Sequence, residues 1–239
     1  MKISVVTPTL RDDAAFRLTR DSIAAQRGVD VEHIVVSPEE FRDTVFRSVV
    51  QPRQGVYAAL NLGTRLSTGD VVGLLHAGDT YASDKVLTLI ARAFETDSDL
   101  DYVYADIQYV SGPERRPTRI YRGLPFDRKH ALRGALPPHP SLYMRRRAVE
   151  ALGPYDTSYI ICGDTEMWLR ILERPALRGR YLPRVTVMMA AGGLSTRLRS
   201  RLLINQREKL RALRAHGLPA SLWRLALKYI YGIPSLFKR

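Results

Sequence analysis

A chain of 239 residues, 45% hydrophobic and 26% charged, has the size and composition of one globular domain with at most a small appendage. Its formal net charge of +13 predicts an anionic partner, such as nucleic acid, a membrane surface or a phosphorylated substrate. The single cysteine, Cys162, excludes an internal disulfide framework and favours a reducing compartment. The sequence contains no secretory signal and no apolar run near the roughly 18 residues that a membrane span requires, so we expect a cytoplasmic protein.

The first hundred residues alternate between strand-like and helix-like segments. Apolar, β-branched runs predict strands over 3–10, 33–36, 44–50, 71–75 and 101–109. Capping residues followed by helical periodicity predict helices over about 13–26, 55–66 and 83–94, with Asp12 or Asp13 and Ser83 as caps. This order predicts an α/β sheet that binds its ligand at the carboxyl ends of the strands.

The second half of the chain is less regular. Residues 111–140 are rich in proline, glycine and arginine, which predicts a flexible segment. Beyond it we expect a strand and a short helix over 141–152, a helix over 164–172, a strand over 181–189 and a basic helix over 196–215.

The basic residues gather towards the end of the chain. From Thr196 onward many lysines and arginines accompany one acid, Glu208, whereas the first hundred residues are nearly balanced in charge. We therefore expect a domain over 1–195 and a basic helical extension over 196–239. A last helix over 221–231 would align Trp223, Ala226, Leu227 and Ile230 on one face. Such a helix suits an anionic membrane interface, or it packs on its own domain.

An aspartate follows the buried strand 71–75. The segment from Gln54 to Asp79 has the pattern of a helix, a tight turn, an apolar strand and then a carboxylate at the exit of the strand. Ligands of open α/β sheets bind at this position, and His76 lies in the same loop. The alternative is that Asp79 caps the turn that follows it.

A second pair of acids opens the predicted helix 164–172. Asp164 and Glu166 point in different directions, because residues two apart do not share a helix face. Acids in a first helical turn are also favoured by the helix dipole alone. The dipole does not account for the Trp168-Leu169-Arg170 that follows.

Taken in order, these segments resemble the family-2 glycosyltransferases of the GT-A fold, of the type that builds bacterial cell-surface glycans. The resemblance covers about residues 2–200 and rests on an ordered set of motifs: Thr7-Pro8-Thr9, Gln54-Gly55-Val56-Tyr57 through Asn61, Gly69-Asp70, Asp79, Tyr104-Ala105-Asp106, His139-Pro140-Ser141, Gly163-Asp164 through Arg170, and Gly192-Gly193-Leu194-Ser195. It implies a GT-A (Rossmann-like) mixed sheet flanked by helices, with residues 111–140 on the acceptor side.

The resemblance also implies a reaction and its residues. A sugar would move from a nucleotide-diphospho-sugar to a hydroxyl of a glycan or glycolipid acceptor, in one displacement that inverts the anomeric centre. Asp164 would be the base that deprotonates the acceptor hydroxyl, and Asp79 would bind Mn²⁺ or Mg²⁺. The remaining implied residues fall into two groups: those at the donor and acceptor pocket, which are His76, Asp106, His139, Glu166 and Trp168, and those at the nucleotide, which are Thr7, Pro8, Thr9, Gln54, Gly55 and Asn61.

Three positions depart from the pattern of the family. Ser37, Arg53 and Ala58 stand where the family usually has aspartates, so the contacts that read the nucleotide base are altered. The sequence therefore leaves the base unassigned, and a catalytically silent relative that acts as a scaffold stays an alternative.

The positive charge alone leaves a nucleic-acid-binding protein as a second alternative. Such a protein usually interleaves aromatic residues with its basic ones on one surface. The predicted basic helix 196–215 contains no aromatic residue. We therefore expect no nucleic-acid partner, and an anionic membrane surface at most.

Overall fold

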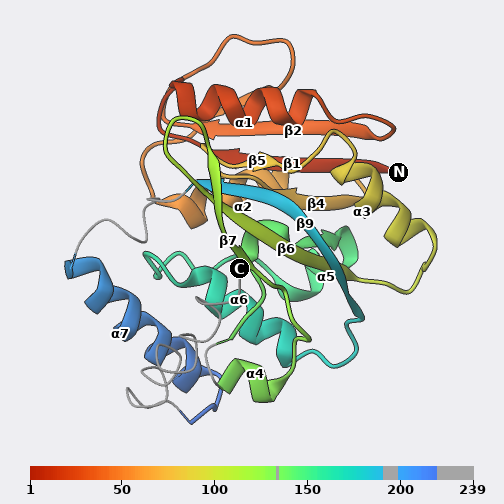
Figure 1. Ribbon diagram of the computed structural model, residues 1–239. Helices are drawn as coiled ribbons and strands as arrows, with labels where there is room; N and C mark the ends of the chain where they lie inside the picture. The colour runs from red at the N-terminus through yellow and green to blue at the C-terminus, as the bar shows by residue number, and fades with distance from the viewer. Residues whose placement is uncertain (133–134, 191–198, 220–239) are drawn as a thin grey trace.

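The computed structural model describes residues 1–132, 135–190 and 199–219, and within them it contains one mixed sheet (Figure 1). The strands are β1 (Lys2–Pro8), β2 (Asp30–Ser37), β3 (Arg47–Val50), β4 (Val71–Leu74), β5 (Thr80–Tyr81), β6 (Tyr102–Ser111), β7 (Arg116–Tyr121), β8 (Tyr143–Arg145) and β9 (Gly179–Ala190). The helices are α1 (Ala14–Ala24), α2 (Val56–Leu66), α3 (Val86–Glu95), α4 (Arg128–Leu132), the 3₁₀ helix η1 (His139–Ser141), α5 (Arg146–Leu152), α6 (Gly163–Leu172) and α7 (Arg199–Ala215).

The sheet joins a parallel half to a mixed half. Its strand order is β3-β2-β1-β4-β8-β6-β9-β5, with β7 paired to β6. Strands β3, β2, β1 and β4 run parallel, and β8 lies antiparallel between β4 and β6. Because β1 and β4 are parallel neighbours, their carboxyl ends lie at the same edge, where ligands of α/β sheets bind.

Helices cover both faces of this sheet. Successive residues of β1 face opposite sides, so Val5 packs in the cluster with α1 and α3, and Val6 packs in the cluster with α2, α5, α6 and α7. Figure 1 shows α1 along one side of the sheet and α5, α6 and α7 on the other. This arrangement confirms the predicted mixed α/β sheet flanked by helices.

Helix α2 approaches the sheet closely and carries the motif that begins at Gly55. The backbone of Gly55 has φ +94°, which a residue with a side chain rarely adopts, and the helix starts directly after it. Gly63, also in α2, packs against β1, and a Cβ added to it would lie 2.4 Å from Val6 Cγ1. The small residue therefore sets the depth at which Tyr57 and Asn61, on the same helix, reach towards α6.

The prediction of a flexible segment over 111–140 is wrong in part. This region contains β7, which pairs antiparallel with β6, and α4. Nearly all residues of β7 are exposed, so the strand lacks the apolar alternation by which a sequence reveals a strand. The prediction of Ser83 as a helix cap is also wrong, because α3 begins at Val86 after Lys85; the cap at Asp13 is confirmed, since Asp13 Oδ1 accepts from Phe16 N.

Helix α7 packs against the domain rather than standing apart from it. Leu210, Ala212 and Leu213 belong to the same core cluster as Trp168, and α7 contacts α6. The predicted boundary between 1–195 and 196–239, the motif 192–195 and the helix 221–231 fall on or next to residues outside the described ranges, so they stay predictions. None of the helices in the described ranges combines the length and apolar character needed to cross a bilayer.

Candidate active site

The first predicted motif lies at the carboxyl end of β1. Thr7 is fully buried, and its Oγ1 lies 3.0 Å from His33 Nε2. Burial lowers the pKa of His33 to about 3, so this histidine is neutral at neutral pH. Pro8 and Thr9 are partly exposed, which leaves these two residues, and not the Thr7 side chain, accessible at the sheet edge.

The loop after β4 is fixed by hydrogen bonds from α1. Thr19 Oγ1 accepts from Gly78 N at 2.9 Å and donates to Asp79 O at 2.7 Å. The Asp79 side chain is 4% exposed, and its Oδ1 accepts from Ala190 N at the end of β9, 3.1 Å away. Among the described residues, the side chain thus bonds to β9 and not to the turn that follows it.

The buried surroundings of the Asp79 carboxyl disfavour its charged form. Burial raises its pKa to about 7, although the Ala190 N–H and the guanidinium of Arg115 act in the opposite direction. A carboxylate with an uncompensated charge gains from a nearby cation. The structure therefore provides one carboxyl that a bound cation would stabilise.

Arg115 contacts the Asp79 loop from another part of the chain, and the sequence analysis did not identify it. It comes from the turn between β6 and β7, where its backbone has φ +50°, an uncommon value for a residue with a side chain. Its guanidinium donates to Gly78 O at 2.9 Å, to Thr80 Oγ1 at 3.2 Å and to Met188 O at 3.0 Å. The hairpin thereby holds the Asp79 loop against β9.

Replacement of Arg115 by methionine is expected to loosen this loop. The change removes three hydrogen bonds from a charged donor, and we expect a loss of about 2 kcal/mol in the free energy of unfolding. Chemical denaturation measures the loss, with Arg116→Met as control, because Arg116 pairs with the exposed Glu114 instead. Equal stabilities for the two variants would contradict the role given to Arg115.

Asp164 lies near the start of α6, next to α2. Gly163 precedes it, and a Cβ there would come within 2.8 Å of the Tyr57 ring, so this position requires glycine. Tyr57 Oη donates to Ile161 O at 2.5 Å and accepts from Asp164 N at 3.4 Å. The Tyr57 hydroxyl thus fixes the backbone on both sides of Gly163.

Burial raises the pKa of Asp164, while the Thr165 N–H, the Lys209 ammonium and His76 lower it. Its Oδ1 accepts from Thr165 N at 2.6 Å. Asp164 is nevertheless partly exposed, so it combines an elevated proton affinity with a route to a substrate. These are the properties of a general base.

His76, in the loop after β4, lies within electrostatic reach of Asp164. Burial lowers the pKa of His76 to about 4, with His139 acting in the same direction and Asp164 against it. Burial also lowers the pKa of His139 to about 4, and its Nε2 lies 2.9 Å from Tyr155 Oη. Both histidines are therefore neutral at neutral pH, and His76 is the one of the two that interacts with the carboxyl of Asp164.

Asn61, Gln54 and Gly55 lie on or just before α2. The Asn61 side chain donates to Tyr155 O at 2.9 Å and accepts from Tyr155 N at 2.8 Å, so its amide is occupied by the protein. Gln54 and Gly55 are exposed. Of this group, the two residues before the helix are the ones free to meet a ligand.

Three residues predicted at the pocket, Asp106, Glu166 and Trp168, are buried in the protein. Asp106 is 3% exposed, and its Oδ1 accepts from Tyr181 Oη at 2.6 Å and from Gly123 N at 2.8 Å. Glu166 is 8% exposed, and its Oε1 lies 2.7 Å from Arg170 Nε and 3.4 Å from His216 Nε2.

Trp168 is the third of these residues and lies in the core. It is 1% exposed, and its ring centroid lies 4.8 Å from that of Phe126 and 5.7 Å from that of Tyr104. Core packing is therefore enough to explain why the motif contains a tryptophan at this position.

Trp168→Ala is expected to cost about 3–5 kcal/mol in the free energy of unfolding, because it removes a fully buried ring and leaves a cavity. Trp168→Phe, which keeps an aromatic ring, is expected to cost less. Urea denaturation of both variants checks the order. A Trp168→Ala variant as stable as the wild type would show that the ring does not support the core.

A metal at this edge would need ligands from outside the protein. Among the residues that the structure describes, no three His, Cys, Asp or Glu side chains gather around one point. Mg²⁺ and Mn²⁺ bound with a nucleotide commonly take one or two carboxylates and complete their shell with phosphate oxygens and water. Asp79 fits a cation of this kind, held jointly with a diphosphate, and does not fit a cage made by protein alone.

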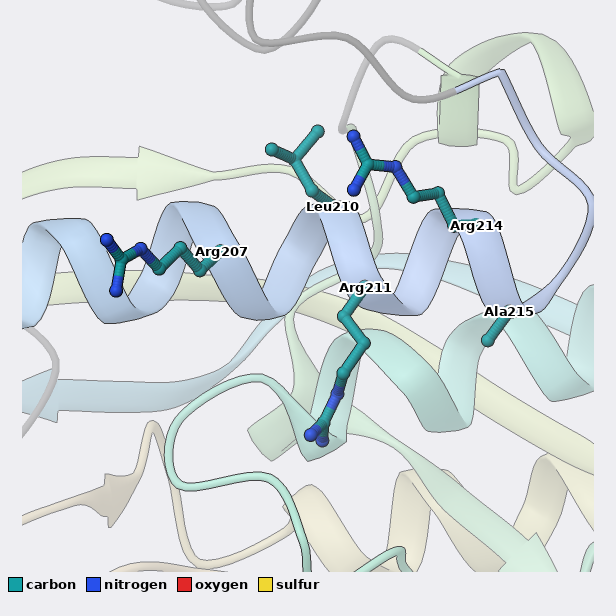
Figure 2. A pocket seen from close by; sticks show the side chains of 5 residues that line it. All are labelled: Arg207, Leu210, Arg211, Arg214 and Ala215. Atoms are coloured by element: carbon teal, nitrogen blue, oxygen red, sulfur yellow. The ribbon is translucent and has the colours of Figure 1, made fainter.

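A separate hollow of about 530 Å³ lies against α7. Arg207, Leu210, Arg211, Arg214 and Ala215 line it (Figure 2). These residues all come from α7 and include none of the predicted site residues. Figure 2 shows Arg211 pointing away from Arg207 and Arg214, so the three guanidinium groups do not converge on one ligand.

Comparison with known proteins identifies the relatives of this chain. The family model described as "Glycosyl transferase family 2" matches residues 4–153. A protein of Mycobacterium bovis named "PGL/p-HBAD biosynthesis glycosyltransferase" is 30% identical over 206 residues, which cover 80% of this chain and 78% of the relative. An uncharacterized glycosyltransferase of Mycobacterium tuberculosis is 26% identical over 183 residues, 70% of this chain and 68% of the relative.

Solved structures share the fold. TarS 1–349 of S. aureus, in complex with UDP, superposes with a TM-score of 0.64 at 14% identity and covers 98% of this chain and 72% of its own. The mannosyltransferase PcManGT of Pyrobaculum calidifontis, in complex with GDP-Man and Mn²⁺, gives a TM-score of 0.59 at 17% identity over 99% of this chain and 81% of its own. The family match and the fold agree with the resemblance found in the sequence: the chain is a glycosyltransferase of family 2 with the GT-A fold.

Proposed function

We propose that this glycosyltransferase moves a sugar from a nucleotide-diphospho-sugar to a hydroxyl group of a cell-surface glycan or glycolipid, with inversion in a single displacement. The observation that carries the proposal is Asp164, a partly exposed carboxyl with a raised pKa near the start of α6, within electrostatic reach of His76 in the loop after β4. The solved relatives support a nucleotide-sugar donor, because they are complexes with UDP-GlcNAc and GDP-Man.

Asp164 is the proposed base. It would take the proton from the acceptor hydroxyl as the oxygen attacks the anomeric carbon. Its raised pKa makes it a better proton acceptor than an ordinary aspartate. The neutral His76, which is partly exposed, would offer a hydrogen bond to a sugar hydroxyl, whereas the buried His139, in contact with Tyr155 Oη, would support the pocket wall.

The donor end of the site is proposed at the exposed parts of two motifs. Pro8 and Thr9 after β1, and Gln54 and Gly55 before α2, are accessible for the nucleotide. Asp79 would hold the divalent cation; when bound, Mn²⁺ or Mg²⁺ neutralises charge on the departing nucleoside diphosphate. Thr7 and Asn61 would support the nucleotide site indirectly, because Thr7 contacts His33 and Asn61 bonds to the backbone of Tyr155.

Asp106, Glu166 and Trp168 are proposed as supports of the pocket. Asp106 fixes Tyr181, and Glu166 pairs with Arg170. Because Asp106 Oδ1 and Glu166 Oε1 already contact protein groups and Trp168 is buried in the core, these residues would shape the pocket walls and not bind the substrate.

The acceptor and the location complete the proposal. The mycobacterial relative is named for PGL/p-HBAD biosynthesis, and the resemblance to transferases of cell-surface glycans supports a glycan or glycolipid acceptor here. With such an acceptor, the enzyme would work at the cytoplasmic face of a membrane, and its basic residues from 196 onward would favour an anionic surface.

Thermal unfolding with a panel of UDP-, GDP- and dTDP-sugars, with and without Mn²⁺, tests the donor. We expect one nucleotide to raise the melting temperature in the presence of Mn²⁺, since a ligand that binds only the folded state stabilises it. No shift with any donor, together with salt-sensitive binding to random DNA, would contradict the proposal and favour a nucleic-acid-binding protein.

A further inference from the structure

A carboxylate of α7 binds the backbone of the segment that leads into α6. Glu208 Oε1 accepts from Ile160 N at 2.7 Å, and its Oε2 accepts from Ile161 N and Cys162 N, both at 2.9 Å. Glu208 is 8% exposed. Three consecutive amides thus converge on one buried carboxylate, and charged acceptors make the stronger hydrogen bonds.

Neighbouring residues of α7 hold the same segment. Arg211 Nη2 donates to Ser158 Oγ at 3.0 Å, and its Cζ lies 3.6 Å from the centre of the Tyr159 ring. The Cys162 thiol lies 3.5 Å from Asn205 O. Contacts from three successive turns of α7 therefore fix residues 158–162.

This segment ends where Asp164 begins. Cys162 is the residue before α6, and only Gly163 separates it from Asp164. On the opposite side, Tyr57 bonds both Ile161 O and Asp164 N. The backbone that carries the proposed base is thus held between α2 and α7, and glycine at 163 would leave it free to move without these contacts.

We propose that α7 is a positioning element of the transfer reaction, in which Glu208 fixes the backbone that carries Asp164. The inference rests on the proposed function of Asp164 as the base. It goes further in assigning to Glu208, which lies outside the matched family region 4–153, a part in positioning the base.

Glu208→Gln tests the positioning role, with Glu150→Gln on the exposed face of α5 as the matched control. The glutamine side chain keeps the size of the glutamate but loses the charge that binds three amides. We expect kcat to fall about 10- to 100-fold, as for other small displacements of a catalytic group, at unchanged KM for the donor. Amide exchange at Ile160, Ile161 and Cys162 should become faster in Glu208→Gln and stay unchanged in Glu150→Gln.

The outcomes separate the two levels of the proposal. Faster exchange at 160–162 with wild-type kcat would overturn the positioning role. A wild-type protein that transfers no sugar from any donor overturns the proposed function itself, whereas the exchange experiment then still reports whether Glu208 holds the segment.

Discussion

Replacement of Asp164 by asparagine is expected to lower kcat for sugar transfer about a thousandfold. Asparagine has the same shape and keeps an oxygen for the Thr165 N–H, but it does not accept the proton of the acceptor hydroxyl. Donor binding should survive, because the nucleotide end of the proposed site lies on other elements. Initial rates give kcat, and the donor-dependent rise in melting temperature gives binding.

The matched control for this variant is Glu173→Gln, which removes a carboxylate from the exposed end of the same helix. We expect this control to keep wild-type kcat. For the wild type, kcat should fall as the pH drops through the pKa of Asp164, and the fall should begin at a higher pH than for an ordinary aspartate because burial raises that pKa. An Asp164→Asn variant with wild-type kcat would place the base elsewhere.

Asp79→Asn is expected to weaken Mn²⁺-dependent donor binding about 100-fold, which corresponds to about 2.7 kcal/mol. The amide keeps an oxygen for the Ala190 N–H but brings no charge to a cation. Calorimetric titration of the nucleoside diphosphate, with and without Mn²⁺, measures the change. Asp84→Asn is the control, since Asp84 is an exposed carboxylate that pairs with Arg27.

The same variant should be more stable than the wild type when no ligand is bound at pH 8. The folded pKa of Asp79, about 7, lies above the ordinary value of 3.8, so the folded state disfavours the charged form. This cost is absent below about pH 4, grows as the pH rises, and is complete above the folded pKa. An Asp79→Asn protein that melts lower than the wild type at pH 8, or that keeps Mn²⁺-dependent binding, would contradict this account.

The sequence predicted the elements whose side chains alternate between core and solvent. Strand β1 and helix α2 have strong apolar periodicity, and their buried residues Val6 and Leu60 lie in one core cluster. Strand β7 was missed because its residues are nearly all exposed, so no apolar pattern marks it. It is a strand because its backbone pairs with that of β6. The motif-based resemblance correctly predicted the family and the GT-A fold.

The candidate site was predictable only in part. The order of the motifs singled out Asp79 and Asp164 as candidates, and their roles stay proposals. A motif does not distinguish a pocket residue from a core residue, as the buried Trp168 illustrates. The contacts of Arg115 with Gly78 and of Glu208 with Ile160 join residues 37 and 48 positions apart. No local pattern marks such pairs, because they depend on how the hairpin and α7 pack.

The most direct test is the release of nucleoside diphosphate from the donor that stabilises the protein, measured with Mn²⁺ and a membrane-lipid extract as the acceptor source. The account predicts release by the wild type that requires the extract and is nearly lost in both Asp164→Asn and Asp79→Asn. Equal release by the wild type and Asp164→Asn, or none by the wild type with any donor, would contradict it.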